Sequence, residues 1–246
     1  MTERTNNTKA IFFDVDDTLY DHLQPLRGAL QEVLGLPDDF PYAEAYHRFR
    51  YYSDWLSDQE DLSAVPEPEA VERMRRQRFE LTMKEFDIAL LKGHAEELQA
   101  QYLNRQFQIQ PFEGAYDLMR KLMADGHTVG LITNGEGGHQ KRKLEALDVF
   151  GLVPEEQIFI SGTIGYAKPD SRLFEHVSKQ TGTDARSSYY IGDSWRNDVV
   201  GAVNAGWKVI WFNHRDAKPE SDHQPHHVAR TYSEVARILT SEFVHK

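Results

Sequence analysis

The stretch IFFDVDDTLY, from Ile11 to Tyr20, decides the fold, because a short apolar run here ends abruptly in acidic residues. Such a run, bounded by a polar cluster, predicts a buried strand of a parallel sheet whose side chains alternate between the two faces. Asp14 and Asp16 should therefore share a side, and Asp17 should point away from them. Ligands of open α/β sheets bind outside the carboxyl ends of the strands, so this pair is placed for chemistry, with a hard cation as the expected companion. The alternative is a strand that ends in a solvated acidic turn.

The composition limits the kinds of partner. The chain has 246 residues, 40% of them hydrophobic, and a formal net charge of −11, so it can bury the core of one large or two smaller domains. The negative charge argues against nucleic-acid or anionic-membrane binding, which normally use cationic patches, and favours a small solute. No cysteine is present, which excludes disulfides and thiolate sites and fits a reducing compartment. Because no apolar stretch is long enough for a membrane span or a signal peptide, we expect a cytoplasmic protein.

Two kinds of sequence divide the chain. Residues 21–110 are polar, aromatic and charged with helical spacing, and they predict an all-helical domain with breaks at Gly35–Asp39 and Val65–Pro68. Residues 1–20 and 111–246 predict a second domain, a doubly wound, mostly parallel α/β sheet, in which Met1–Lys9 is too polar to pack. Its later strands are expected at 128–133, 157–161, 188–192 and 208–212, and its helices at 114–125, 139–147, 169–181, 198–205 and 233–243.

Two of the later stretches place groups for phosphate near strand ends. Thr133 and Asn134 end the strand TVGLIT, where a hydroxyl and free backbone N–H groups could bind a phosphate. Lys168 precedes a helix whose first position suits Pro169. The lysine ammonium group is a compact point charge that could screen the repulsion between neighbouring anions. Taken singly, each of these residues has an ordinary structural explanation.

A fourth stretch, IGDSWRND, ends a strand in Asp193 and begins the next helix near Asp198. Asp193 is the expected direct Mg²⁺ ligand, because this ion prefers oxygen ligands. Asp198 either acts through a metal-bound water or complements the helix dipole. Read in order, the four stretches resemble the four motifs of the haloacid dehalogenase (HAD) superfamily, and the helical segment lies where one cap type of that family is inserted.

The resemblance implies a magnesium-dependent phosphatase. Asp14 would attack phosphorus and form an aspartyl-phosphate, which water then hydrolyses. Asp16 would protonate the leaving oxygen and then deprotonate the water, so its side chain should stay off the metal while its main-chain carbonyl binds it. Electrostatic stabilisation of the phosphoryl group would carry most of the catalysis. The residues implied for the metal are Asp14, Asp16, Asp193 and Asp198, those for phosphate Thr133, Asn134 and Lys168, and those for catalysis Asp14, Asp16 and Lys168.

Several functions stay open at this point. The substrate would be a small phosphorylated metabolite, with a nucleoside-5′-monophosphate favoured and phosphoglycolate or a sugar phosphate as alternatives. A phosphomutase would keep the same four motifs. A haloacid dehalogenase would need neither magnesium nor a general acid at Asp16. A catalytically silent binding protein could also use this fold, and the sequence does not define the oligomeric state.

The helical segment would form the cap implied by the resemblance, which excludes water from the site. Its aromatic residues could stack on a base, although helical spacing is more typical of a core. These residues are Tyr42, Tyr46, Phe49, Tyr51, Tyr52 and Trp55. Its arginines could contact a substrate anion or simply pair with acids on the surface. These are Arg73, Arg75, Arg76 and Arg78.

Overall fold

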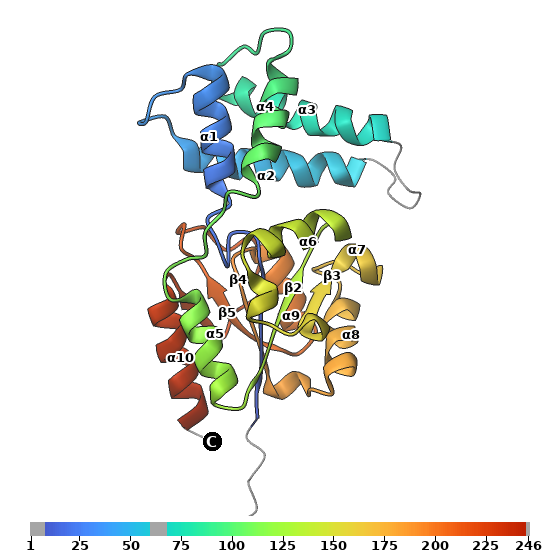
Figure 1. Cartoon of the computed structure of the whole chain (residues 1–246), viewed down its shortest axis with the longest axis vertical. Helices are drawn as coiled ribbons and strands as arrows, with labels where there is room; N and C mark the ends of the chain where they lie inside the picture. Colours follow the sequence, from blue (N-terminus) through green and yellow to red (C-terminus); the bar gives the residue numbers. More distant parts are fainter. Residues whose placement is uncertain (1–7, 60–67, 245–246) are drawn as a thin grey trace, which may run out of the picture. The chain divides into compact units, whose positions relative to one another are not determined.

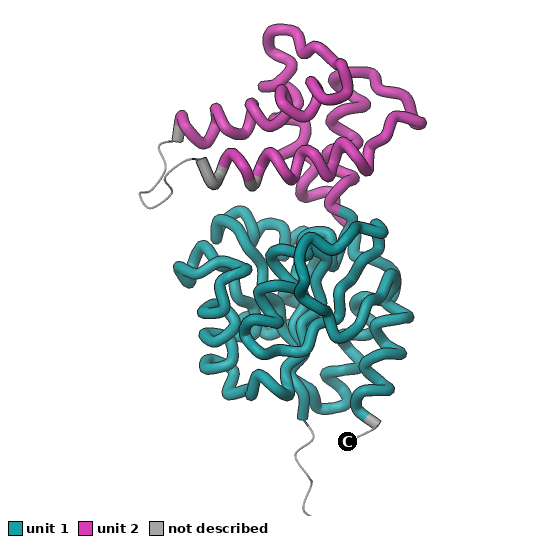
Figure 2. The backbone as a smooth tube through the Cα atoms, turned by 180° about the vertical axis from the view of Figure 1, so that it is seen from behind, with its two compact units in different colours: residues 1–21, 110–246 teal, residues 22–109 magenta. Residues whose placement is uncertain are grey.

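The computed structural model describes residues 8–59 and 68–244. The chain divides into two compact units, coloured separately in Figure 2. One comprises Met1–Asp21 and Gln110–Lys246, and the other His22–Ile109. The first unit contains every motif residue named above. Most of the polar arm Met1–Lys9 lies outside the described residues.

The first unit is built on a six-stranded parallel sheet with the order β3-β2-β1-β4-β5-β6 (Figure 1). The strands are β1 (Ala10–Phe13), β2 (Thr128–Thr133), β3 (Ile158–Ile160), β4 (Ser188–Gly192), β5 (Lys208–Phe212) and β6 (His227–Ala229). Phe13 pairs with Leu131 on one side and with Ile191 on the other. The carboxyl ends of β1, β2 and β4 therefore meet at one edge of the sheet. The predicted α/β class is confirmed, and β6 is a strand that the sequence analysis did not predict.

The central strands are apolar on both faces because helices cover both. The helices of this unit are α5 (Ala115–Ala124), α6 (Gly137–Ala146), α7 (Ser161–Ile164), α8 (Ser171–Thr181), α9 (Gly201–Asn204) and α10 (Tyr232–Val244). Phe12 joins a core with Phe174 of α8, whereas Phe13 stacks on Tyr232 of α10. Successive residues of one strand thus bury opposite faces of the sheet. Each fully buried side chain of this size contributes about 1.5–3 kcal/mol.

Short helical turns complete the connections. Single 3₁₀ turns span Val149–Gly151, Glu155–Gln157 and Ala185–Ser187, and a π-helical turn spans Trp195–Val200 before α9. The expected helix 198–205 therefore begins three residues earlier, where the Ser194 hydroxyl accepts from the backbone N–H of Asn197.

The prediction that Pro169 opens a helix is wrong. Helix α8 begins at Ser171, because the Asp170 side chain caps it by accepting from the backbone N–H of Arg172. Aspartate is among the preferred residues at this capping position. Pro169 lies outside the helix, and its bond to Lys168 is cis.

In its described residues, 22–59 and 68–109, the second unit contains four helices, α1 (Leu23–Leu34), α2 (Tyr42–Gln59), α3 (Pro68–Glu85) and α4 (His94–Arg105). Helix α1 ends at Gly35, whose φ of 63° glycine adopts without strain. The break at Gly35–Asp39 is confirmed, whereas that at Val65–Pro68 lies largely outside the described residues. Among the helices that the structure describes, none has the length and hydropathy that crossing a bilayer requires.

Half of the six aromatic residues of α2 lie in the core of this unit. Tyr42, Tyr46 and Phe49 are buried, whereas Tyr51 and Trp55 are exposed. Phe49 packs against Phe79 of α3 and Tyr102 of α4, with ring centroids 4.7 and 5.3 Å away. The interpretation of this stretch as core therefore holds for its buried members.

Candidate active site

A buried lysine joins two acids at the carboxyl edge of the sheet. Lys168 Nζ donates to Asp14 Oδ1 at 2.6 Å, to Asp198 Oδ1 at 2.7 Å and to the Tyr190 hydroxyl at 2.8 Å. Lys168 and Asp14 are each 5% exposed, and Asp198 is fully buried. Three segments far apart in the sequence thus meet around one ammonium group.

Asn134 fixes the main chain of that lysine. Its Nδ2 donates to the Lys168 carbonyl and its Oδ1 accepts from the Lys168 N–H, both at 2.9 Å. Both ends of the Asn134 amide are thus occupied by the Lys168 main chain, and the role of Asn134 in phosphate binding stays a prediction. The Thr133 hydroxyl is buried, and its one hydrogen-bond contact within the described part of the chain is a long one of 3.5 Å to the Asn134 carbonyl.

The residues present fit a divalent metal. Carboxylate oxygens of Asp14, Asp193 and Asp198 lie within 4.8 Å of one another, and they form the one such cluster found among the described residues. Oxygen donors of this kind are those that Mg²⁺ prefers. The Thr18 hydroxyl lies 3.4 Å from both Asp14 and Asp193 and accepts from the Asp193 N–H at 3.1 Å. Three acids beside one buried ammonium leave negative charge that a divalent cation would balance.

The buried charges perturb one another strongly. Burial raises the pKa of Asp14 to about 7, although Lys168 acts in the opposite direction. Burial alone would lower the pKa of Lys168, but the attraction of Asp14 and Asp198 outweighs it, so the ammonium form is held. Burial, with the nearby acids adding to it, raises the pKa of Tyr190 well above 10. Tyr190 therefore remains a neutral hydroxyl that accepts from Lys168 and donates to the Ile132 carbonyl.

Asp16 has its own set of donors. Lys143 Nζ lies 2.9 Å from both of its carboxylate oxygens, the Tyr20 hydroxyl 2.5 Å from Oδ1, and Gln140 Nε2 3.2 Å from Oδ2. Its carboxylate is not a member of the metal-type cluster found among the described residues, and a side chain kept off the metal stays a prediction. The sequence analysis missed Lys143 and Gln140. Their spacing of three residues on a helix that follows a site strand was the available signal.

Asp17 points into a separate network, as predicted. Its backbone has a φ of 64°, and its carboxylate accepts from Arg215 at 2.6 and 2.8 Å. Arg215 also pairs with Asp21. Arg215 thus ties the segment that follows β1 to the segment that follows β5.

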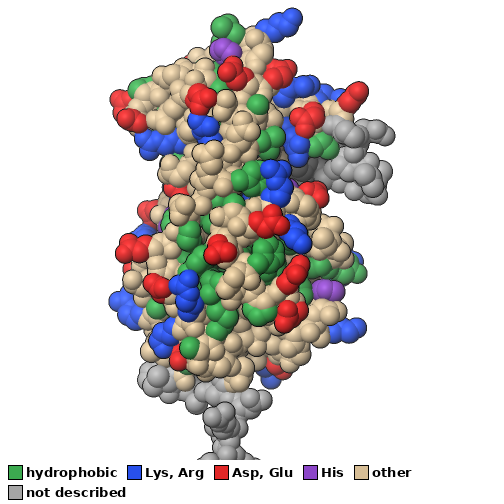
Figure 3. All heavy atoms as spheres, viewed as in Figure 1, with side chains coloured by type: hydrophobic (Ala, Val, Ile, Leu, Met, Phe, Trp, Pro, Cys, Tyr) green, Lys and Arg blue, Asp and Glu red, His purple; other side chains and the backbone are tan. Residues whose placement is uncertain are grey.

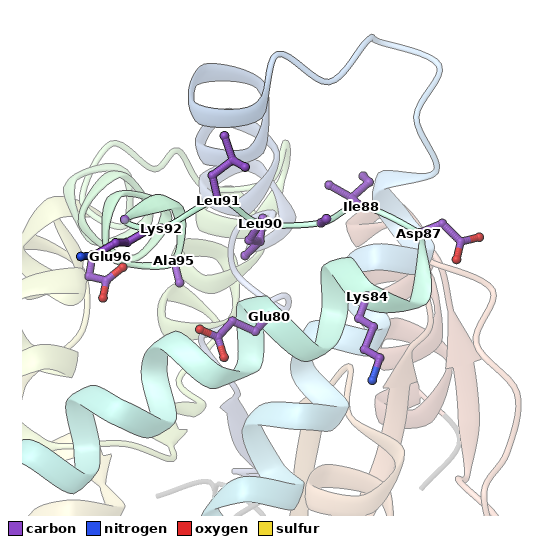
Figure 4. Close-up of a pocket in the computed structure, with 11 residues that line it drawn as sticks. Glu80, Lys84, Asp87, Ile88, Leu90, Leu91, Lys92, Ala95 and Glu96 are labelled. Carbon is purple, nitrogen blue, oxygen red and sulfur yellow. The ribbon is translucent and has the colours of Figure 1, made fainter.

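The cavity drawn in Figure 4 contains no motif residue. It encloses about 520 Å³ within the helical unit and is lined by Glu80, Lys84 and residues 87–93, 95 and 96. Two of the arginines noted above pair with acids, Arg75 with Glu72 and Arg76 with Glu96. On the face shown in Figure 3, acidic and basic side chains are interspersed.

Curated proteins of known activity resemble the chain over most of its length. It is 27% identical over 215 residues to a glyceraldehyde 3-phosphate phosphatase of Pyrococcus abyssi, covering 84% of this chain and 82% of that protein. It is 28% identical over 243 residues to the pyrimidine 5′-nucleotidase PynA of Streptococcus pneumoniae, covering 97% and 98%.

Solved structures share the fold. The HAD-hydrolase YfnB from Bacillus subtilis, solved bound to magnesium, has a TM-score of 0.69 and 24% identity, covering 94% of this chain and 98% of that one. The L-2-haloacid dehalogenase RSc1362 has a TM-score of 0.72 and 15% identity, covering 95% and 99%. Residues 8–206, most of the chain, match the model of the haloacid dehalogenase-like hydrolases. With the converging motif residues described above, this match places the chain in the haloacid dehalogenase-like hydrolase family.

Proposed function

We propose that the protein is a magnesium-dependent phosphatase that hydrolyses small phosphate monoesters through an aspartyl-phosphate. The observation that carries the proposal is the Lys168 ammonium group, which lies 2.6 Å from Asp14 and 2.7 Å from Asp198. Asp193 belongs to the same carboxylate cluster. Relatives of similar length are phosphatases of a triose phosphate and of nucleotides. Their names support phosphate-ester hydrolysis as the reaction class.

Asp14 is the proposed nucleophile. One of its carboxylate oxygens attacks phosphorus, the bond to the ester oxygen breaks, and Asp16 gives that oxygen a proton. In the second step Asp16 takes a proton from water, the water oxygen attacks phosphorus, and the bond to Asp14 breaks. Each carboxylate thus returns to its starting state.

Two further groups would contact the phosphoryl oxygens. Lys168 would donate to one of them, and the buried Thr133 hydroxyl, with a single long contact of 3.5 Å, is available to another. A magnesium ion held by Asp14, Asp193 and Asp198 would neutralise charge on the phosphoryl group. The main-chain carbonyl of Asp16 is its proposed fourth protein ligand.

The substrate is proposed by class. Nucleoside-5′-monophosphates and triose or other sugar phosphates are the first candidates, because PynA and the archaeal phosphatases carry those names. Dehalogenation is less well supported although RSc1362 shares the fold, because Asp16, Asp193 and Asp198 are all retained. We also propose that the helical unit acts as the substrate-selecting cap and that the protein works in the cytoplasm.

A panel of phosphorylated metabolites, assayed with magnesium and again with a chelator, tests this function. We expect phosphate release from small monoesters with magnesium and none with the chelator. The Asp14→Asn variant is the matched control, because its fold should persist while turnover stops. Phosphate release that continues in the chelator or in this variant would reject the proposed mechanism. Turnover that requires a bisphosphorylated sugar would instead indicate a phosphomutase.

A further inference from the structure

We propose that Lys143, Gln140 and Tyr20 are positioning residues that aim the Asp16 carboxyl group at the leaving oxygen. This inference rests on the proposed function, since Asp16 needs an aim only if it transfers a proton. Lys143 and Gln140 were not singled out from the sequence as part of the site, whereas Tyr20 follows the first motif directly. Two of them lie on α6, the helix that follows the second motif.

The contact between Lys143 and Asp16 is symmetric and buried. Nζ lies 2.9 Å from each carboxylate oxygen, which fixes the plane of the carboxylate as well as its position. Lys143 is 2% exposed, although lysine is among the residues least often buried. Within residues 8–59 and 68–244, Asp16 is the one acid that pairs with it.

Gln140 and Tyr20 hold the same carboxylate from two other directions. Gln140 Nε2 donates to Asp16 Oδ2 at 3.2 Å and to the Asn134 carbonyl at 2.8 Å. Since both partners are acceptors, the amide can have only this orientation. The Tyr20 hydroxyl donates to the other oxygen at 2.5 Å from a ring that is fully buried. Three donors from two segments thus restrict one side chain.

The backbone beside α6 is shaped to admit this arrangement. Gly135 has a φ of 143°, and a Cβ built on it would lie 2.6 Å from Gln140 Nε2. The inward face of α6 buries Gln140, Lys143 and Leu144, so two of its three buried side chains are polar. Burying polar and charged groups costs stability unless they are paired. A helix needed only for packing would bury apolar residues on this face.

The chemistry of the leaving group separates positioning from general structural support. An alkyl alcohol is a poor leaving group and needs a proton as its bond to phosphorus breaks, whereas nitrophenol leaves readily as its anion. A residue that aims the proton donor should therefore matter mainly for alkyl esters. A residue that only supports the fold should affect both kinds of ester alike.

The experiment compares kcat/KM for p-nitrophenyl phosphate and for the preferred alkyl monoester of the panel. We expect Lys143→Met to lower kcat/KM for the alkyl ester about tenfold to a hundredfold, which is part of the rate enhancement that a general acid provides. For p-nitrophenyl phosphate the same variant should lower kcat/KM less than about threefold. Lys143→Arg should recover most of the loss. Lys141→Met is the matched control, since Lys141 lies on the same helix with its side chain 55% exposed.

Two further variants extend the test, and the first of them leaves Lys143 in place, so it is informative even if Lys143→Met does not fold. Tyr20→Phe removes one hydroxyl and should show the same selectivity for alkyl esters to a smaller degree. In an Asp16→Asn background, Lys143→Met should cause no additional selective loss. Equal losses on both esters, or an effect of Lys141→Met of the same size, would overturn the inference while leaving the phosphatase intact. A wild-type protein that hydrolyses neither ester would reject the proposed function itself.

Discussion

Replacing Asp14 with Asn should stabilise the metal-free protein at alkaline pH while it abolishes turnover. Burial raises the pKa of this carboxyl from 3.8 to about 7, so the folded protein holds the proton more tightly than the unfolded chain does. Between these two values the free energy of unfolding falls as the pH rises. Each unit of pKa difference corresponds to about 1.4 kcal/mol, so ionising the buried carboxyl lowers the free energy of unfolding by at most about 4 kcal/mol above pH 7.

The asparagine side chain is neutral at every pH and avoids this cost. Lys168 also pairs with Asp198, 2.7 Å away in the wild-type protein, and this pair should persist in the variant, so no buried ammonium would be left alone. We therefore expect Asp14→Asn to raise the free energy of unfolding by about 1–3 kcal/mol near pH 8 and by less than half of that near pH 5. Magnesium should reverse the order, because it binds the wild-type carboxylate more tightly and stabilises the state that binds it.

Urea unfolding followed by tryptophan fluorescence measures these differences, since the chain has four tryptophans. Each protein is unfolded in chelator near pH 8 and near pH 5, and again with magnesium. Asp117→Asn is a suitable control, because its side chain is 86% exposed and the change should lie within about 0.5 kcal/mol. An Asp14→Asn protein that is less stable than wild type in chelator near pH 8, or whose gain in stability does not depend on pH, would contradict the raised pKa of Asp14.

Three more predictions concern stability, geometry and the metal. The hydrogen bond from Lys208 lowers the pKa of Glu242 from 4.5 to about 2. The ionised carboxylate therefore adds to the free energy of unfolding above pH 4.5, and this addition is lost as the pH falls toward 2. Glu242→Gln should lower the free energy of unfolding by about 1–2 kcal/mol near neutral pH, where the pKa shift sets an upper limit of about 3 kcal/mol, and by little in strong acid. A loss of the same size in acid, measured by urea unfolding, would contradict this. A Cβ at Gly192 would lie 2.4 Å from the Asp198 carboxyl group, so Gly192→Ala should lower kcat roughly tenfold or more by displacing that acid; steady-state kinetics at saturating magnesium would show whether it does. Chelation should abolish turnover and lower the melting temperature, and added magnesium should restore both in an activity and a thermal-unfolding assay.

The strands were predictable where a short apolar run has polar boundaries. Residues 128–133, 188–192 and 208–212 form strands with the expected bounds, because parallel strands buried on both faces must be apolar throughout. Strand β6 was not predictable in this way, since it has three residues and one of them, Val228, is 51% exposed. Three residues carry too little pattern to distinguish a strand from a loop.

The site was predictable at the strand ends and not on the helices. Asp14 and Asp193 follow from the rule that ligands bind at the carboxyl edge of a parallel sheet. Lys168 was identified through the family resemblance, since it lies shortly before α8 and not at the end of a strand. Lys143 stands in the run KRK, which is typical of a solvated helix face, and its burial depends on contacts with a residue 127 positions away. The partnership of Asn134 with the Lys168 main chain likewise appears only when the two segments meet in space.

The pair of amide-to-backbone bonds from Asn134 has a practical consequence for chemical rescue. Because these bonds hold the main chain at position 168, they do not depend on which side chain that residue carries. The chain has no cysteine, so a Lys168→Cys variant would hold a single thiol. Aminoethylation of that thiol in the unfolded protein, followed by refolding, would return an ammonium group to nearly the same place on a side chain in which sulfur replaces one methylene.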